Sequence, residues 1–180
     1  MKLETPRLLL TSLTADDWPL FLRLFQDPQV IRYIADPLPE HEIRERFEAR
    51  LPAWDKHCDR WLCLVMREKS SGQAVGMTGF RPEWSPCQQA EVGFGSLPEG
   101  QGKGYGKESL PVILDFAFNA CGFHKVYATV TEGNLASRGL LESCGFQLEG
   151  TLRDNFRLAD RWCNDWRLGL LATEFAAAER

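Results

Sequence analysis

A glycine-rich stretch between two regular segments constrains the fold of this chain more than any other feature. Glycine stands at the alternate positions 102, 104 and 106, after the strand candidate 89–97 and before the helix candidate 110–119. Without a Cβ atom the backbone can approach a ligand closely, and free amides at the start of a helix attract an anion. The pattern predicts a strand, a phosphate-holding loop and a helix; a plain flexible turn is the alternative reading.

Two common nucleotide-binding motifs do not fit this loop. The Walker motif requires glycine at 101 and Ser or Thr after Lys107, but Gln101 and Glu108 stand there. The dinucleotide motif G-x-G-x-x-G, read from Gly102, requires glycine at 107, where the chain has lysine. The sequence therefore argues against a Walker-type ATP site and against a Rossmann fold.

Strand-like and helix-like segments alternate along the rest of the chain. Apolar, β-rich segments predict strands at 7–12, 61–68, 74–81, 89–97, 124–131, 146–153 and 166–171. Amphipathic spacing and capping residues predict helices at 14–25, 40–54, 110–119 and 135–144. Pro111 is expected to disturb the third of these helices, because it lacks an amide hydrogen and crowds the preceding turn. The order indicates an α/β protein.

Composition and charge narrow the class of protein. A chain of 180 residues that is 44% hydrophobic is expected to form one domain, 1–180, with a core of its own. Its 25 acidic and 21 basic residues give a net charge of −4 without a basic block, so no nucleic-acid partner is expected. The sequence shows neither a signal peptide nor an apolar run of ~20 residues, which predicts a cytoplasmic protein with no membrane partner. The six cysteines stand singly, so we expect reduced thiols and no structural zinc.

The glycine loop also carries a family signature. The run Gln101-Gly-Lys-Gly-Tyr-Gly106 matches the pattern Q/R-x-x-G-x-G/A, and here the chain resembles the GNAT acetyltransferase superfamily, which binds a pyrophosphate at that signature. The segments 91–108, 134–137 and 142–146 extend the resemblance over most of the chain. The opening Glu4-Thr-Pro-Arg-Leu-Leu-Leu10 is similar to the branch that contains the ribosomal-protein N-terminal acetyltransferases.

This resemblance implies a GNAT fold, a mixed and strongly twisted sheet of six to seven strands whose central fourth and fifth strands part, flanked by about four helices. It also implies acetyl-CoA as a cosubstrate and no metal. Pantetheine is expected to pair with the backbone of 94–97, and the pyrophosphate to bind the amides of 102–107. The expected acetyl-CoA-binding residues are Phe94, Gly95, Ser96, Leu97, Gln101, Gly102, Lys103, Gly104, Tyr105, Gly106, Lys107 and Asn134.

Acetyl transfer to an amine needs a neutral nucleophile, stabilisation of the developing oxyanion and a proton for the leaving thiolate. Amines with pKa values between ~8 and ~10 are mostly protonated at neutral pH, so a carboxylate is expected as the base. Family members often have an acid at the position of Glu91, which makes it the first candidate; Glu83 and Glu149 are competitors. The alternative reading of Glu91 is a solvated or ion-paired strand carboxylate. A backbone N–H near Phe94 or Gly95 is expected to meet the oxyanion.

The proton donor to the thiolate is assigned through the resemblance. Many family members have a tyrosine where this chain has Leu141. In the branch that it resembles, a serine three residues after an asparagine is the proposed substitute, which points to Ser137 as the thiol-side donor and Asn134 as a ligand-orienting residue. Both residue types are also ordinary helix caps. Tyr105 and Tyr127 are the alternatives to Ser137.

The acceptor is expected to be a primary amine. The branch suggests the N-terminal amine of a protein or peptide, with a polyamine, an amino acid or an antibiotic amine as small-molecule alternatives. The first two helices and the segments 82–87 and 154–164 are expected to border its site. Candidate wall residues are Trp18, Tyr33, Trp84 and Trp162. A non-catalytic acyl-CoA-binding domain is the rival function, and the chain is expected to be a monomer or a homodimer.

Overall fold

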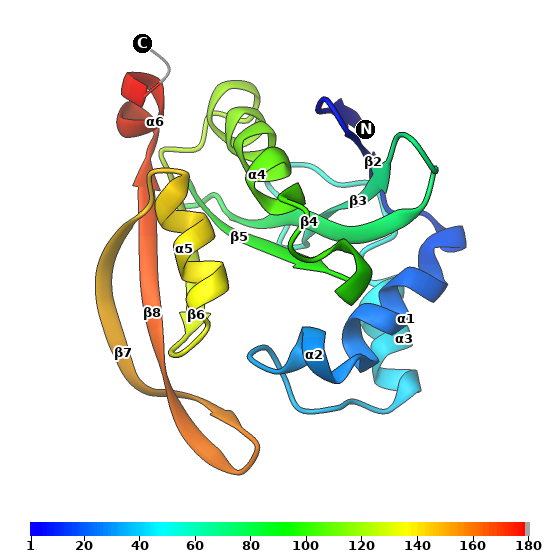
Figure 1. The fold of residues 1–180 in the computed structure, drawn as a ribbon. Coiled ribbons are helices and arrows are strands. Elements are labelled where there is room, and N and C mark those ends of the chain that lie inside the picture. The colour runs from blue at the N-terminus through cyan, green and yellow to red at the C-terminus, as the bar shows by residue number, and fades with distance from the viewer. Residues whose placement is uncertain (179–180) are drawn as a thin grey trace.

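The structure is a computed structural model that describes residues 1–178 (Figure 1). Eight strands form one sheet in the order β1-β2-β3-β4-β5-β6-β8-β7. The strands are β1 (Lys2–Glu4), β2 (Leu8–Ser12), β3 (Leu62–Glu68), β4 (Ala74–Glu83), β5 (Gln89–Ser96), β6 (Lys125–Thr131), β7 (Gln147–Leu158) and β8 (Arg161–Leu171). The helices are α1 (Trp18–Gln26), α2 (Pro28–Ile31), α3 (Glu40–Glu48), α4 (Tyr105–Asp115), α5 (Leu135–Ser143) and α6 (Ala172–Ala178).

Both faces of the sheet are covered, because successive strand residues point to opposite faces. Leu64 on β3 shares a buried cluster with Ile113 of α4. The next residue, Val65, belongs to a second cluster with Phe21 of α1 and Phe47 of α3. Figure 1 shows α4 and α5 in front of the sheet, and α1 beside α3 at the lower right. The site described below lies in the sheet between these two layers of helices.

The two central strands, β5 and β6, are parallel neighbours that pair over a short distance. Their register runs from Gln89 with Lys125 to Glu91 with Tyr127. β5 then continues to Ser96 and β6 to Thr131 without pairing with each other. The two strands therefore part, as the resemblance implied for the fourth and fifth strands, which are β5 and β6 here because β1 is an additional strand.

The numbers of strands and helices differ from the expectation. The described residues form eight strands and six helices, where six to seven strands and about four helices were expected. The additional elements β1, α2 and α6 are three, four and seven residues long, too short for a clear periodicity. The helix expected at 40–54 ends at Glu48, before Pro52. No helix in the described part of the chain has the length and apolar character needed to span a membrane.

The last two strands are longer than expected, and the segment 154–164 is not a separate connection. β7 and β8 extend into this segment and form a hairpin, whose register pairs Leu158 with Arg161. Nearly all side chains of β7 are exposed. A strand without an alternating apolar face leaves little signal in the sequence, which explains the wrong boundary.

The helix after the glycine loop runs through Pro111 and then changes its hydrogen-bonding pattern. Residues Phe116–Ala120 form a π-helical segment directly after α4. Within it the Cys121 amide donates to the carbonyl of Phe116, five residues earlier, at 3.0 Å. The disturbance expected at Pro111 and in the turn before it is not seen, because α4 is continuous from Tyr105 to Asp115. The irregular segment begins five residues after the proline.

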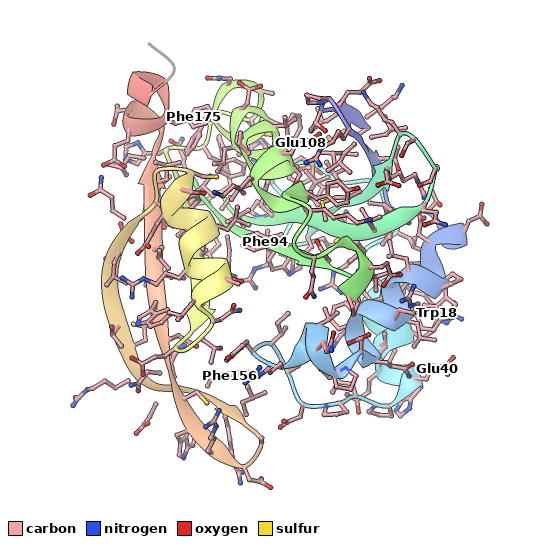
Figure 2. The ribbon with its side chains drawn as sticks, in the orientation of Figure 1. Trp18, Glu40, Phe94, Glu108, Phe156 and Phe175 are labelled. Carbon is pink, nitrogen blue, oxygen red and sulfur yellow. The ribbon has the colours of Figure 1, made fainter. Side chains whose placement is uncertain are left out.

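The chain's opening residues are tied to the first turn of α4. The carboxylate of Glu108 accepts hydrogen bonds from Thr5 Oγ1 at 2.5 Å, from the Arg7 amide at 2.7 Å and from Arg7 Nε at 2.6 Å. Its side chain is only 13% exposed. Burial alone would raise the pKa of Glu108, but these hydrogen bonds outweigh it and hold the pKa below the ordinary value. Glu108 (Figure 2) therefore stabilises the fold as an anion.

We expect Glu108→Gln to lower the free energy of unfolding by about 1–2 kcal/mol at pH 7, because hydrogen bonds to a charged group are lost. A carboxylate whose pKa is lowered by folding stabilises above its unfolded pKa and ceases to do so as pH falls through the lowered value. The difference between the two proteins should therefore shrink below about pH 4. Urea unfolding at several pH values measures it; a difference independent of pH would contradict the role of this charge.

Candidate active site

The gap between β5 and β6 opens into a cavity of about 500 Å³. Five residues expected at the site line it: Glu91, Phe94 and Gly95 from β5, and Asn134 and Ser137 from the beginning of α5. Phe94 stands where β5 passes below α4 and beside α5 (Figure 2). The fold thus brings the predicted base and the predicted thiol-side donor to one cavity.

The cavity reaches both faces of the sheet. On one face lies Ser137 of α5. Trp166 on β8 faces the same helix, since Arg138 of α5 lies over its ring at 4.6 Å from the centroid. The preceding residue, Asp165, therefore points to the opposite face, and it also lines the cavity. The cavity is a passage through the sheet, from the side of α4 and α5 to the side of α1, α2 and α3.

The free edge of β5 supplies backbone groups to this passage. The Leu97 amide donates to the Val75 carbonyl at 2.9 Å, so the backbone N–H of Leu97 is directed to β4. By the alternation of an antiparallel pair, Phe94 and Ser96 direct their N–H and C=O groups to the other edge, towards the gap. The Ser96 carbonyl there accepts from Gln101 Nε2 at 3.0 Å. Of the four residues expected to pair with pantetheine, Phe94 and Ser96 direct their backbone groups to the gap.

The three glycines of the loop are needed for different reasons. Gly102 and Gly104 have φ angles of +72° and +80°, in the region that favours glycine. Gly104 caps the N-terminus of α4, which begins at Tyr105. At Gly106 a Cβ atom would lie 2.7 Å from a methyl group of Leu140. The exposed loop therefore presents the first amides of α4 to solvent, as an anion site requires.

The side chains of this loop divide into free and occupied groups. Lys103 and Lys107 are exposed, so their ammonium groups can approach a phosphate. Tyr105 is buried, and its hydroxyl donates to the carboxylate of Glu68. Its expected role in binding acetyl-CoA is therefore restricted to its backbone amide.

Arg7 is a neighbour of the loop that the sequence analysis did not include. A Cβ atom on Gly104 would lie 3.6 Å from Arg7 Nη2. The guanidinium also stacks on Tyr105, 4.9 Å from the ring centroid, while its Nε is held by Glu108. Arg7 belongs to the opening run 4–10, which indicated a branch of the family but did not predict that this residue lies beside the glycine loop. Arg7 adds positive charge beside the anion site.

Of the three carboxylates considered as the base, Glu91 is the one that lines the cavity. Its side chain is 21% exposed, and Oε2 lies 3.3 Å from Arg81 Nη2. Glu83 ends β4 and accepts from the Tyr127 hydroxyl at 2.7 Å. Glu149 lies on β7, away from the cavity lining. The geometry therefore agrees with Glu91 as the candidate and also shows the ion-pair contact of its alternative reading.

Asn134 and Ser137 form a helix cap at the edge of the cavity. Asn134 Oδ1 accepts from the Ser137 amide at 3.2 Å, so its Nδ2 group is the part left for a ligand. The hydroxyl of Ser137 is not needed for this cap. Tyr105 and Tyr127 are not among the lining residues, and burial together with the Glu83 hydrogen bond raises the pKa of Tyr127 to about 12. Ser137 is thus the better placed hydroxyl.

The cysteine thiols whose pKa values are raised by burial are poorly suited to act as nucleophiles. Cys63 lines the cavity, but burial raises the pKa of its thiol to about 11. Burial likewise raises the pKa of Cys121 to about 11 and that of Cys144 above its ordinary value. Protonated thiols are poor nucleophiles. Among residues 1–178, no three His, Cys, Asp or Glu side chains are grouped as metal ligands.

The aromatic wall differs from the expected one. Only Tyr33 of the four candidates lines the cavity, together with Trp61 and Phe156. The other three lie elsewhere: Trp18 packs on Phe47, Trp84 packs on Phe123 and Trp162 is 64% exposed. Spacing in the sequence could not distinguish core aromatics from cavity aromatics, because both follow the same periodicity.

Two contacts between distant segments lie at the end of the passage near α2. The ring of Tyr33, after α2, lies beside Gly133 in the loop before α5, where a Cβ atom would be 3.6 Å away. Asp36 Oδ1 accepts from the Ala159 amide at the tip of the β7–β8 hairpin at 2.9 Å. Figure 1 shows α2 approaching both of these segments.

Solved structures share this fold. An acetyltransferase of the GNAT family from Bacillus anthracis superposes with a TM-score of 0.83 at 22% identity, over 97% of this chain and 100% of the other. The spermidine N-acetyltransferase from Vibrio cholerae in complex with CoA and spermine gives a TM-score of 0.82 at 23% identity, over 94% and 98%.

The sequence has characterised and uncharacterised relatives. It is 29% identical over 156 residues to the uncharacterised N-acetyltransferase YoaA of Bacillus subtilis, which covers 84% of this chain and 85% of the relative. It is 33% identical over 88 residues to the spermidine N(1)-acetyltransferase of Vibrio cholerae, about half of each chain (49% and 51%). The acetyltransferase (GNAT) domain model matches residues 7–147. With the parted strands and the glycine loop, this match shows that the chain belongs to the GNAT family and is an acetyl-CoA-dependent N-acetyltransferase.

Proposed function

We propose that the protein transfers the acetyl group to a primary amine by direct attack, with acetyl-CoA and the amine bound together in the passage between β5 and β6. The observation that carries the proposal is the placement of Glu91, Phe94 and Ser137 around one cavity. They supply a base, a backbone donor and a hydroxyl donor. These are the three groups that the reaction requires.

Acetyl-CoA fits the free groups on the side of α4 and α5. The first amides of α4 bind its pyrophosphate, supported by the charges of Lys103, Lys107 and Arg7. The gap-facing backbone of Phe94 and Ser96 pairs with the amides of the pantetheine arm, in the place that a neighbouring strand would occupy. The thioester then reaches the passage from this side.

Glu91 removes the proton that makes the acceptor an ammonium ion, directly or through a water molecule. Its contact with Arg81 is long, at 3.3 Å to Oε2, which leaves Oε1 for the amine. The Phe94 N–H, which faces the gap, stabilises the charge that develops on the carbonyl oxygen. The alternation along β5 directs the N–H of Gly95 to β4 and makes it the weaker of the two expected donors.

Ser137 donates a proton to the departing thiolate. Its position is fixed through its amide by Asn134 Oδ1, so its hydroxyl is free for this role. Transfer through an acyl-cysteine is disfavoured, because burial raises the pKa of Cys63, the cysteine that lines the cavity.

Two classes of acceptor remain as proposals. The opening run of the sequence favours the N-terminal amine of a protein or peptide. The relatives named for spermidine, and the solved neighbour bound to CoA and spermine, favour a polyamine. The contacts of Tyr33 with Gly133 and of Asp36 with Ala159 narrow the acceptor side. We therefore favour a small, slender amine over the terminus of a folded protein.

A pair of substitutions at Gly102 tests the pyrophosphate site. Asp and Asn both tolerate a positive φ, and a Cβ atom there has no neighbour within 4 Å, so Gly102→Asp and Gly102→Asn differ mainly in one charge. We expect the Kd of acetyl-CoA to be about tenfold or more higher for the Asp variant, because like charges repel near the surface. Calorimetric titration measures both values, and equal Kd values would reject the loop as the anion site.

Glu91→Gln tests the base. The amide keeps the shape of the side chain but cannot take a proton, so kcat should fall by about 10²-fold or more while the Kd of acetyl-CoA is unchanged. Glu83→Gln is the matched control, since that carboxylate lies outside the cavity lining. Unimpaired turnover of Glu91→Gln would assign the residue to the ion pair with Arg81 instead.

Ser137→Ala tests the thiol-side donor without disturbing the cap, because Asn134 binds the backbone amide of residue 137. We expect a fall in kcat of about 10²-fold with an unchanged melting temperature. Ser143→Ala, at the other end of α5, removes a hydroxyl that bonds the Leu140 carbonyl and should leave kcat unaltered. Equal kcat values for the two variants would remove Ser137 from the mechanism.

A further inference from the structure

A buried carboxylate in the passage has one oxygen without a protein partner. Asp165 on β8 is 3% exposed and lines the cavity. Its Oδ2 accepts from Asn155 Nδ2 at 2.8 Å, whereas its buried Oδ1 has no hydrogen-bond partner among residues 1–178. An unpaired, buried carboxylate oxygen is costly for a fold. Such a group calls for a donor from a ligand.

Asp165 stands at the other end of the passage from Glu91. It pairs with Thr131 on β6, while Glu91 pairs with Tyr127 on the same strand. Paired residues share a face of the sheet, so both carboxylates point to the acceptor side. Four residue steps separate Tyr127 from Thr131, about 13 Å at about 3.3 Å per residue. One small cation cannot contact both carboxylates.

An irregularity of β7 holds Asp165 in place. The register between β7 and β8 shifts between Leu152 and Phe156. Within the shifted stretch Asp154 has a φ of +48°, and Asn155 turns its amide to Asp165. Phe156, directly after it, lines the cavity on the side of α2 (Figure 2). Bulges that redirect side chains are frequent beside active sites. This one gives the carboxylate a hydrogen-bond donor and places Phe156 in the lining of the same cavity.

The cations of the neighbourhood are engaged elsewhere or lie at another wall. Arg167, two residues along β8, donates to Thr129 Oγ1 at 2.9 Å and stacks over Tyr127 at 3.6 Å. Arg46 and Arg50 line the cavity from the region of α3, beside α1 and away from β8 (Figure 1). The end of the passage at Asp165 is thus the end suited to a positive charge.

We infer that Asp165 binds a second positive charge of the acceptor, one that does not react; the inference rests on the proposed function. Glu91 already serves the reacting amine in the proposed function, and Asp165 lies too far along β6 to contact the same nitrogen. The charge that Asp165 meets is therefore a second one, at the other end of the acceptor. Asp165 is then a specificity-determining residue, and the acceptor is a diamine whose aliphatic spacer is long enough to reach from the neighbourhood of Glu91 to Asp165.

Binding of matched amines to the CoA-loaded protein tests this inference without requiring turnover. Octanediamine and octylamine share a spacer long enough for this separation and differ in the second ammonium group. We expect calorimetry to give a Kd at least tenfold lower for the diamine. Asp165→Asn should bring the two Kd values together, whereas Asp160→Asn should not. Asp160 is the control because its side chain is 95% exposed at the tip of the same hairpin, where it pairs with Arg157.

Equal binding of both amines by the wild-type protein, or absence of binding of either, would overturn the inference, and this comparison needs no variant. A preference for the diamine that persists in a folded Asp165→Asn protein would equally overturn it, since another group would then read the charge. Failure of the proposed function looks different: the diamine binds preferentially, but acetyl-CoA and the diamine together yield neither free CoA nor acetylated amine.

Discussion

The separation of β5 from β6 after three paired positions is the constraint on which the site depends. β4 pairs with one edge of β5 and β8 with one edge of β6 over the whole length of each strand. The two free edges therefore face each other, and their backbone groups need partners from outside the sheet. A ligand with amide groups along a flexible arm is chemically the closest substitute for a missing strand. Glu91 stands at the last paired position, so the proposed base lies where the gap begins.

The polar groups to which roles are proposed in the passage come from elements with different partners. Glu91 is carried by a strand and lies beside Arg81. Ser137 is carried by the first turn of α5 and is oriented by a cap that leaves its hydroxyl free. Asp165 is carried by β8 and supported by Asn155 from a neighbouring strand. Three independent supports allow each group to be altered without moving the other two.

Local chemistry was readable from the sequence, and long-range pairing was not. The glycine loop, the cap at Asn134 and the strand that carries Glu91 follow from residue types at short spacing, and the structure contains them. The roles of Arg7 and Asp165 depend on contacts between segments far apart in the chain. The bulge at Asn155 depends on the register of β7 against β8, and β7 is exposed along most of its length and carries no apolar alternation. Interior and cavity aromatics likewise differ only in their tertiary surroundings.

In the proposed function, acetyl-CoA and the acceptor reach the passage from opposite faces of the sheet. The donor's side is made of backbone amides and of glycines whose φ angles or close neighbours resist substitution. The acceptor's side is made of side chains from α2, β8 and the irregular stretch of β7, where replacements need not disturb the sheet. Selection for a different acceptor can therefore change the residues on one face of the passage while those on the other face stay constant. Proteins with this fold can differ in the acceptor that they bind while they keep the same binding site for the acetyl donor.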